Sequence, residues 1–284
     1  MLNKYSQSCK SIRKYFGLSQ NELALQTGVS RVTIARLENE MFIPKRNTLD
    51  AILSFAYRNG LNLNEINCQL LEGDKNDNVL LFHGSRDKII SSFDLNHSKG
   101  TNDFGKAFYA GETYKQAAAW VCAYPNSYVY SFYFNSKKDL KYHEFSADID
   151  WMLAICYYRG RINEYSKHPK IQKIIKMVEE ADYIIAPIAD NIMYETLNEF
   201  ANKEITDEQC RHCLSANSLG RQYVFLTEKA LNNINTTNEM VLCSDEKSTY
   251  MQNKNERKRI SIDKTRIAKM EYRREGKYLD ELLR

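Results

Sequence analysis

Two β-prone runs between residues 79 and 109, joined through a glycine bend, limit most strongly what this sequence can fold into. The first run, Val79–Phe82, delivers His83-Gly84-Ser85 at its end, and the second, Ala107–Tyr109, follows a Phe104-Gly105 bend. A helix-like segment then closes the unit. Because strand ends and the loops beside them are where ligand-contacting side chains are most often displayed, His83 and Tyr109 are predicted to form two walls of a cleft.

The other periodic segments mix strands and helices without a regular alternation. Tyr128–Phe134 and Gln222–Leu226 are rich in the aromatic and β-branched residues of strands, and Gln222–Leu226 is predicted to be the last core strand. Helical stripes occupy Trp151–Tyr158 and Asn191–Ala201. Since the βαβ pattern of a doubly wound parallel sheet is not seen, we predict an α+β fold.

The N-terminal part of the chain carries the start and stop signals of short helices. Ser19 and Glu22 have the spacing of a capping box, in which each side chain reaches the backbone of the other residue. Gly28 suits a sharp turn that needs positive φ, and Ser30 suits the cap of the next helix. Thr48 is predicted to cap a further helix that runs through Tyr57.

These residues resemble a lambda-repressor-like (Xre-type) helix-turn-helix domain over residues 8–71. The resemblance implies that Ser30–Asn39 enters the major groove of DNA by its N-terminal end. Glu40 stands where such domains usually have a helix-ending Gly, and Asn39 is predicted to supply the left-handed residue instead. The alternative is a docking or dimerisation module that keeps the fold without binding DNA. The candidate DNA-binding residues are Gln20, Ser30, Arg31, Thr33 and Arg36.

A polar segment, residues 72–78, marks the predicted boundary between a first domain over 1–72 and a second over 78–235. A basic C-terminal extension, 236–284, is predicted to follow. Residues 1–60 carry nine Lys/Arg against four Asp/Glu, and residues 251–284 carry eleven against six, whereas the middle carries twenty against twenty-six. This distribution favours contact with polyanions at the two ends of the chain.

Taken together, the motifs of the second domain resemble the ADP-ribosyltransferase superfamily, in the branch with His, Tyr and a third residue on three core strands. Within that branch they resemble a bacterial family of ADP-ribosyltransferase-like domains labelled a domain of unknown function. The resemblance covers residues 78 to 232 and implies a split β-sheet with flanking helices. Its marks are His83-Gly84-Ser85, Asp103-Phe104-Gly105-Lys106-Ala107-Phe108-Tyr109, Gln222-Tyr223-Val224-Phe225 and Thr227-Glu228-Lys229-Ala230.

The resemblance implies NAD as substrate and a reaction through an oxocarbenium-like sugar, whose positive charge the site must stabilise. By this resemblance His83 would hydrogen-bond the adenosine-side ribose, and the Gly84 backbone, assisted by Ser85, would hold the nicotinamide amide. Tyr109 would offer its aromatic face to the nicotinamide ring. The implied binding residues are His83, Gly84, Ser85, Phe104, Gly105 and Tyr109, and the implied catalytic residues are His83, Tyr109 and Gln222.

Gln222 departs from the enzyme pattern, in which this position is usually Glu. An amide can hydrogen-bond a ribose hydroxyl but brings no negative charge. Loss of one preorganised group of this kind is worth roughly 3–4 kcal/mol. Asp190, Glu195 and Glu228 are nearby acids that could compensate, and the sequence does not choose among them. The two common glycine-loop nucleotide signatures, GxGxxG and GxxxxGK[ST], do not occur.

We therefore expect an NAD-dependent mono-ADP-ribosyltransferase, a toxin-like or defence effector fused to a DNA-binding domain, that modifies a macromolecule. The alternative is a non-catalytic transcriptional regulator whose second domain binds NAD, ADP-ribose or a partner protein. A third hypothesis is an interaction module with a vestigial cleft. The expected partners are DNA, a macromolecular ADP-ribose acceptor and, by analogy, an antitoxin-like protein and a second copy of the chain.

The cysteines and the apolar runs indicate the compartment. The seven cysteines have no framework spacing, the chain opens without a leader, and no run approaches the ~20 apolar residues of a membrane helix. A cytoplasmic protein with free thiols and no membrane contact is expected. Cys210-Arg211-His212-Cys213 has no second Cys/His pair at suitable spacing, so no metal is expected and both thiols are predicted to pack inward.

Overall fold

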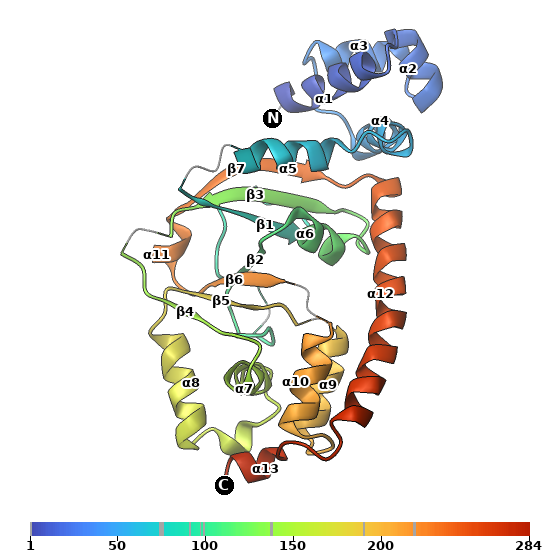
Figure 1. Ribbon diagram of the computed structural model, residues 1–284. Coiled ribbons are helices and arrows are strands. Elements are labelled where there is room, and N and C mark those ends of the chain that lie inside the picture. The colour runs from blue at the N-terminus through green and yellow to red at the C-terminus, as the bar shows by residue number, and fades with distance from the viewer. Residues whose placement is uncertain are drawn as a thin grey trace.

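The structure is a computed structural model that describes residues 2–73, 77–90, 92–96, 98, 100–136, 139–189, 191–217 and 220–284. A helical N-terminal region precedes a mixed sheet with flanking helices, which confirms the predicted α+β fold (Figure 1). The N-terminal region consists of α1 (Leu2–Tyr15), α2 (Gln20–Thr27), α3 (Arg31–Glu38), α4 (Arg46–Arg58) and α5 (Leu63–Gly73).

The caps of α2 agree with the predictions from sequence, whereas the C-terminal end of α3 and the N-terminal end of α4 do not. Ser19 and Glu22 form the predicted capping box, and Gly28 ends α2 at a φ of 69°. Glu40, not Asn39, takes the left-handed conformation, with a φ of 59°. The left-handed residue belongs one position beyond the helix cap, and Asn39 is itself the cap of α3. Thr48 lies inside α4, which begins at Arg46, so it does not cap that helix.

The sheet has the strand order β4-β5-β6-β2-β1-β3-β7. One strand follows Gln222–Leu226, which is therefore not the last core strand as predicted. This strand, β7, has a polar centre of the kind that an edge strand tolerates. It begins at Ile234, so the predicted boundary between 235 and 236 falls inside it, near its start. The strands are β1 (Val79–Ser85), β2 (Phe108–Gly111), β3 (Tyr128–Phe134), β4 (Tyr142–Glu144), β5 (Tyr183–Pro187), β6 (Arg221–Phe225) and β7 (Ile234–Val241).

The sheet is divided between β1 and β2. β1 pairs with β3 at seven positions but with β2 through the single described pair Phe82↔Gly111. One half of the sheet is therefore β7-β3-β1 and the other is β2-β6-β5-β4, as Figure 1 shows. His83 lies on one side of this division and Tyr109 on the other.

Different helices cover the two halves. Helix α6 (Tyr114–Val121) packs on the β1 half, where Ala118 and Val121 meet Phe82 in a buried cluster. The β2 half shares a larger core with its helices, in which Trp151 is fully buried. The flanking elements are α7 (Ile149–Tyr158), η1 (Asn163–Tyr165), α8 (Pro169–Glu179), α9 (Asn191–Ala201), α10 (Asp207–Ser215) and α11 (Glu228–Leu231).

The predicted basic extension is mostly one long helix, α12 (Ser244–Glu271), followed by α13 (Leu279–Leu282). Figure 1 shows α12 running along the molecule from the neighbourhood of α4 to that of α10 and α9. Its residues 251–260 are all exposed, whereas Ser261, Thr265 and Ala268 are buried. The middle of α12 is thus a solvated helix, and its two ends are docked.

The helical N-terminal region packs directly on β7 and the start of α12. Val241 of β7 belongs to the same buried cluster as Tyr5 and Ile52 of this region. Arg46 donates to the Leu242 carbonyl at 2.7 Å, and the Ser244 amide donates to the Asp50 carboxylate at 2.7 Å. The two regions are therefore held together by a shared apolar core and a set of hydrogen bonds, and not by the chain connection through 72–78 alone.

Candidate functional site

His83 bridges the division in the sheet through its ring. Its Nδ1 lies 2.7 Å from the carbonyl oxygen of Tyr109 on β2. Because a carbonyl oxygen can only accept, Nδ1 carries the proton and Nε2 keeps its lone pair. Burial lowers the pKa of His83 to about 4, although the tyrosine carbonyl opposes that shift. The imidazole is therefore neutral near pH 7 and can accept a hydrogen bond at Nε2.

Tyr109 ties β2 to the bend that precedes it. Its hydroxyl donates to the Gly105 carbonyl at 2.8 Å and accepts from the Phe104 amide at 3.1 Å. Gly105 has a φ of 74°, a left-handed conformation that favours glycine at this bend. Burial raises the pKa of Tyr109, so the phenol remains protonated. Phe104 and Gly105, predicted as binding residues, thus position the phenol.

Gln222 reaches the same bend from the neighbouring strand. Its side chain is buried, and Nε2 donates to Asp103 Oδ2 at 2.8 Å and to the Pro187 carbonyl at 3.2 Å. Gly111 pairs with Gln222 while Tyr109 pairs with Val224, so Tyr109 and Gln222 project from the same face of the sheet. These two predicted residues therefore converge on residues 103–105.

Asp103 is the acid at this convergence, and it is only 5% exposed. Arg159 donates to its Oδ1 from Nη2 at 2.9 Å and from Nε at 3.3 Å, and the Tyr194 hydroxyl donates to the same oxygen. Burial raises the pKa of Asp103, whereas Arg159 and Gln222 favour the charged carboxylate. Four elements thus meet at one carboxylate: the bend, the end of α7, α9 and β6.

The acids proposed from sequence do not take this place. Glu195 is exposed on α9. Glu228 is exposed on α11, which follows the C-terminal end of β6, whereas Gln222 lies near the N-terminal end of that strand. Asp190 lies outside the described residues. In the sequence, Asp103 is distinguished only as the first residue of the Asp103–Tyr109 motif. Its partners Arg159 and Tyr194 are 56 and 91 residues away, a separation at which no local pattern could have revealed them.

The remaining predicted binding residues lie along the end of β1. A Cβ added to Gly84 would come within 2.7 Å of the Ala117 carbonyl oxygen, so α6 packs against this backbone. The Ser85 hydroxyl donates to the Asp87 carbonyl at 2.7 Å. The structure therefore brings Tyr109, Gln222 and Asp103 together. His83 contacts the Tyr109 backbone, but its ring lies beside Phe108 at a centroid distance of 4.5 Å. Because Phe108 and Tyr109 are successive residues of β2, the imidazole lies on the face of the strand opposite the Tyr109 phenol.

Comparison with known families assigns the second domain. A family model described as "Protein of unknown function (DUF3990)" matches residues 79–236, from the start of β1 into β7. The chain belongs to the DUF3990 family. A second model, described as "Helix-turn-helix", matches residues 10–55. Searches of curated proteins and of solved structures found no match.

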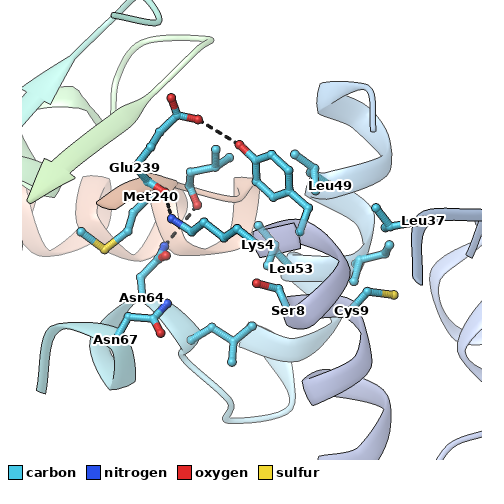
Figure 2. Close-up of a pocket in the computed structure, with 14 residues that line it drawn as sticks. Lys4, Ser8, Cys9, Leu37, Leu49, Leu53, Asn64, Asn67, Glu239 and Met240 are labelled. Atoms are coloured by element: carbon cyan, nitrogen blue, oxygen red, sulfur yellow. Dashed lines mark hydrogen bonds between the residues drawn. The ribbon is translucent and has the colours of Figure 1, made fainter. Parts of the chain in front are cut away.

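The DUF3990 match contains every residue of the candidate site, including Asp103, Arg159 and Tyr194. Two hollows in the structure lie elsewhere. One, of about 30 Å³, lies between the helix-turn-helix region and β7, where Figure 2 shows Lys4 reaching toward Glu239. The other, of about 660 Å³, lies among α9, α10 and α12 and is lined by acidic and basic side chains, including Glu195 and Arg266. Neither touches His83, Tyr109 or Gln222.

The helix-turn-helix residues predicted to meet DNA fall into two groups. Arg31 and Arg36 are exposed on α3, and Ser30 caps that helix by accepting from the Thr33 amide at 3.1 Å. Gln20 instead donates to the buried carboxylate of Glu38 at 2.7 Å, so its amide has a structural partner. In Figure 1, α2 and α3 lie on the side of the helical region away from the DUF3990 sheet. The N-terminal end of α3 is thus presented outward.

Cys210 and Cys213 are both buried, as predicted. In the part of the chain that the structure describes, no group of three or more His, Cys, Asp or Glu side chains could hold a metal ion. Within the same part, none of the helices combines the length and apolar character needed to cross a membrane.

Proposed function

We propose that this chain is an NAD-dependent mono-ADP-ribosyltransferase that its helix-turn-helix domain directs to DNA, and that it transfers ADP-ribose to a macromolecule. The observation that carries the proposal is the convergence of Tyr109 and Gln222 on one face of a divided sheet, with a neutral His83 at the same division. An aromatic ring, a hydrogen-bond acceptor and an oriented amide suit recognition of a planar base and sugar hydroxyls.

In the proposed reaction, the bond between nicotinamide nitrogen and ribose carbon breaks, and its electron pair leaves with neutral nicotinamide. A nucleophilic atom of the acceptor then bonds to the same carbon and loses its proton. Nε2 of His83 would accept a hydrogen bond from a ribose hydroxyl. The Gln222 amide oxygen would accept a hydrogen bond from a second ribose hydroxyl, and the Asp103 carboxylate, itself ion-paired with Arg159, would hold that amide in place.

The test is transfer of labelled ADP-ribose by the purified full chain. NAD labelled in its adenylate part is incubated with cell lysate, and acceptors are followed by label and mass shift. The double variant His83→Ala/Tyr109→Ala is expected to lose transfer. A matched control, Tyr142→Ala/His143→Ala, changes the same residue types on the edge strand β4. The proposal fails if wild type transfers no more than the His83/Tyr109 variant.

The contact between the two regions favours a second candidate, a regulator whose DUF3990 domain binds NAD or ADP-ribose without turnover. Asn64 of α5 donates to the Val241 carbonyl at 3.1 Å, and Tyr5 donates to Glu239 at 2.9 Å, so the helical region touches the sheet directly. A ligand that shifts β7 could therefore change DNA affinity. Calorimetry would then show binding without nicotinamide release, and DNA affinity would change when the ligand is added.

A further inference from the structure

The two oxygens of Asp103 serve different partners. Oδ1 accepts from Arg159 and Tyr194, whereas Oδ2 accepts from Gln222. The Arg159 guanidinium also lies over the Tyr194 ring, and this cation–π contact fixes the two partners relative to each other. The carboxylate is consequently fixed from the α7 and α9 side, and its second oxygen is directed at β6.

This arrangement also fixes which way the Gln222 amide points. Its Nε2 makes two hydrogen bonds, to Asp103 and to the Pro187 carbonyl, and an amide nitrogen carries two hydrogens. The orientation with nitrogen toward Asp103 is therefore set by the network, and Oε1 is the acceptor that Gln222 can offer a ligand. A carboxylate that accepts from an amide polarises it, which makes that oxygen a stronger acceptor.

A contribution to stability is a weak explanation for the buried ion pair between Asp103 and Arg159. A buried ion pair is often no more stabilising than apolar residues of similar volume, because both charges must leave water. Position 222 is also matched to Asp103. A glutamate there would place a second carboxylate against the first at close range, and like charges at that distance disfavour the ionised pair. The amide at 222 and the acid at 103 thus form a complementary pair.

We propose that Asp103 is a positioning residue of the candidate site: held by Arg159 and Tyr194, it orients and polarises the Gln222 amide as the acceptor for a ligand hydroxyl. This inference rests on the proposed function, since it assigns a role in the same site. Asp103 acts through Gln222, and the charge of the pair lies on the bend rather than on the strand.

A charge exchange tests the proposal in the full chain. D103N removes the charge, Q222E sets two carboxylates against each other, and D103N/Q222E returns one acid and one amide to the pair. Each single variant is expected to lower kcat for NAD about tenfold or more, with KM changed less than about threefold. The double variant is expected to recover at least about tenfold over either single variant, because the hydrogen-bonded pair is restored.

Tyr194→Phe is the milder probe, because it deletes one hydrogen bond to Asp103 and leaves every charge in place. It is expected to lower kcat about two- to fivefold without changing KM. It remains informative where D103N does not fold, which thermal unfolding reports. A kcat for Tyr194→Phe and for folded D103N within twofold of wild type overturns the positioning role alone. Wild-type turnover no higher than that of His83→Ala/Tyr109→Ala overturns the proposed function, and the positioning role with it.

Discussion

One hydrogen bond and burial together determine the tautomer and the protonation state of His83. The Tyr109 carbonyl fixes the tautomer, and burial keeps the ring neutral, with a pKa of about 4. In the unfolded chain the same imidazole takes up its proton near its ordinary pKa of 6.5. Between these two values the unfolded state binds more protons than the folded state. His83 therefore makes the folded state less stable as the pH falls from 6.5 toward 4.

His83→Asn is expected to remove this acid sensitivity while keeping an N–H donor for the Tyr109 carbonyl. Chemical denaturation at a series of pH values measures the free energy of unfolding. Between pH 6.5 and 4.5, wild type is expected to lose about 1–3 kcal/mol more than the variant. At pH 7.5 and above, the difference between the two proteins should be constant. Parallel curves across the acid range would show that the fold does not depress the pKa of His83.

Gly84 gives a second prediction at this scale, because its neighbours leave no room for a side chain. A Cβ there would lie 2.7 Å from the Ala117 carbonyl oxygen and 2.8 Å from Val121 Cγ1. Backbone cannot yield as a flexible side-chain end can, so Gly84→Ala is expected to destabilise the protein by about 1–3 kcal/mol. Gly73→Ala is the matched control, since a Cβ at Gly73 meets nothing within 4 Å. Equal unfolding midpoints for the two variants would refute the close packing of α6 on β1.

At the scale of elements, α3 is the helix that is predicted to contact DNA. Its exposed Arg31 follows the capping Ser30, at the helix end that the helix-turn-helix resemblance brings to the major groove. If Arg31 contacts a phosphate, Arg31→Ala should weaken binding and reduce the slope of log affinity against log salt by about 1. Titration of a duplex selected from a random pool, at several salt concentrations, measures both effects. Arg161→Ala, an exposed arginine of the DUF3990 domain, serves as control, and a shared slope for both variants excludes the phosphate contact.

Elements were predictable where their signals are local. The capping box at Ser19, the left-handed Gly28 and the cap at Ser30 each depend on residues within one helical turn, and the structure contains all three. β7 escaped prediction because an edge strand needs few apolar residues and its centre is polar. For the same reason of locality, the acid partner of Gln222 could not be found, since Asp103 precedes it by 119 residues.

At the scale of the whole molecule, the two regions are joined more closely than the polar segment at 72–78 indicates. The composition of that segment predicts a domain boundary. The packing of the two regions is instead determined by contacts between residues far apart in the sequence. Glu246, near the start of α12, makes one such set of contacts and is only 2% exposed. It accepts from Asn64 of α5 at 2.9 Å and from the Tyr114 hydroxyl of α6 at 2.7 Å. One carboxyl group therefore links the helix-turn-helix region, α6 and α12.

This link gives the molecule a pH dependence opposite in sign to that of His83. Burial raises the pKa of Glu246 to about 7, although its two hydrogen bonds oppose the shift, while the unfolded chain releases the proton near 4.5. The folded state thus binds more protons between these values, and stability falls as the pH rises from 4.5 to 7. Glu246→Gln keeps the hydrogen-bonding shape without the charge, so at pH 8 it should be about 1–3 kcal/mol more stable relative to wild type than at pH 4.5. Denaturation of both proteins at the two pH values measures this change, and an unchanged difference would mean that the junction holds a charged carboxylate at no expense to folding.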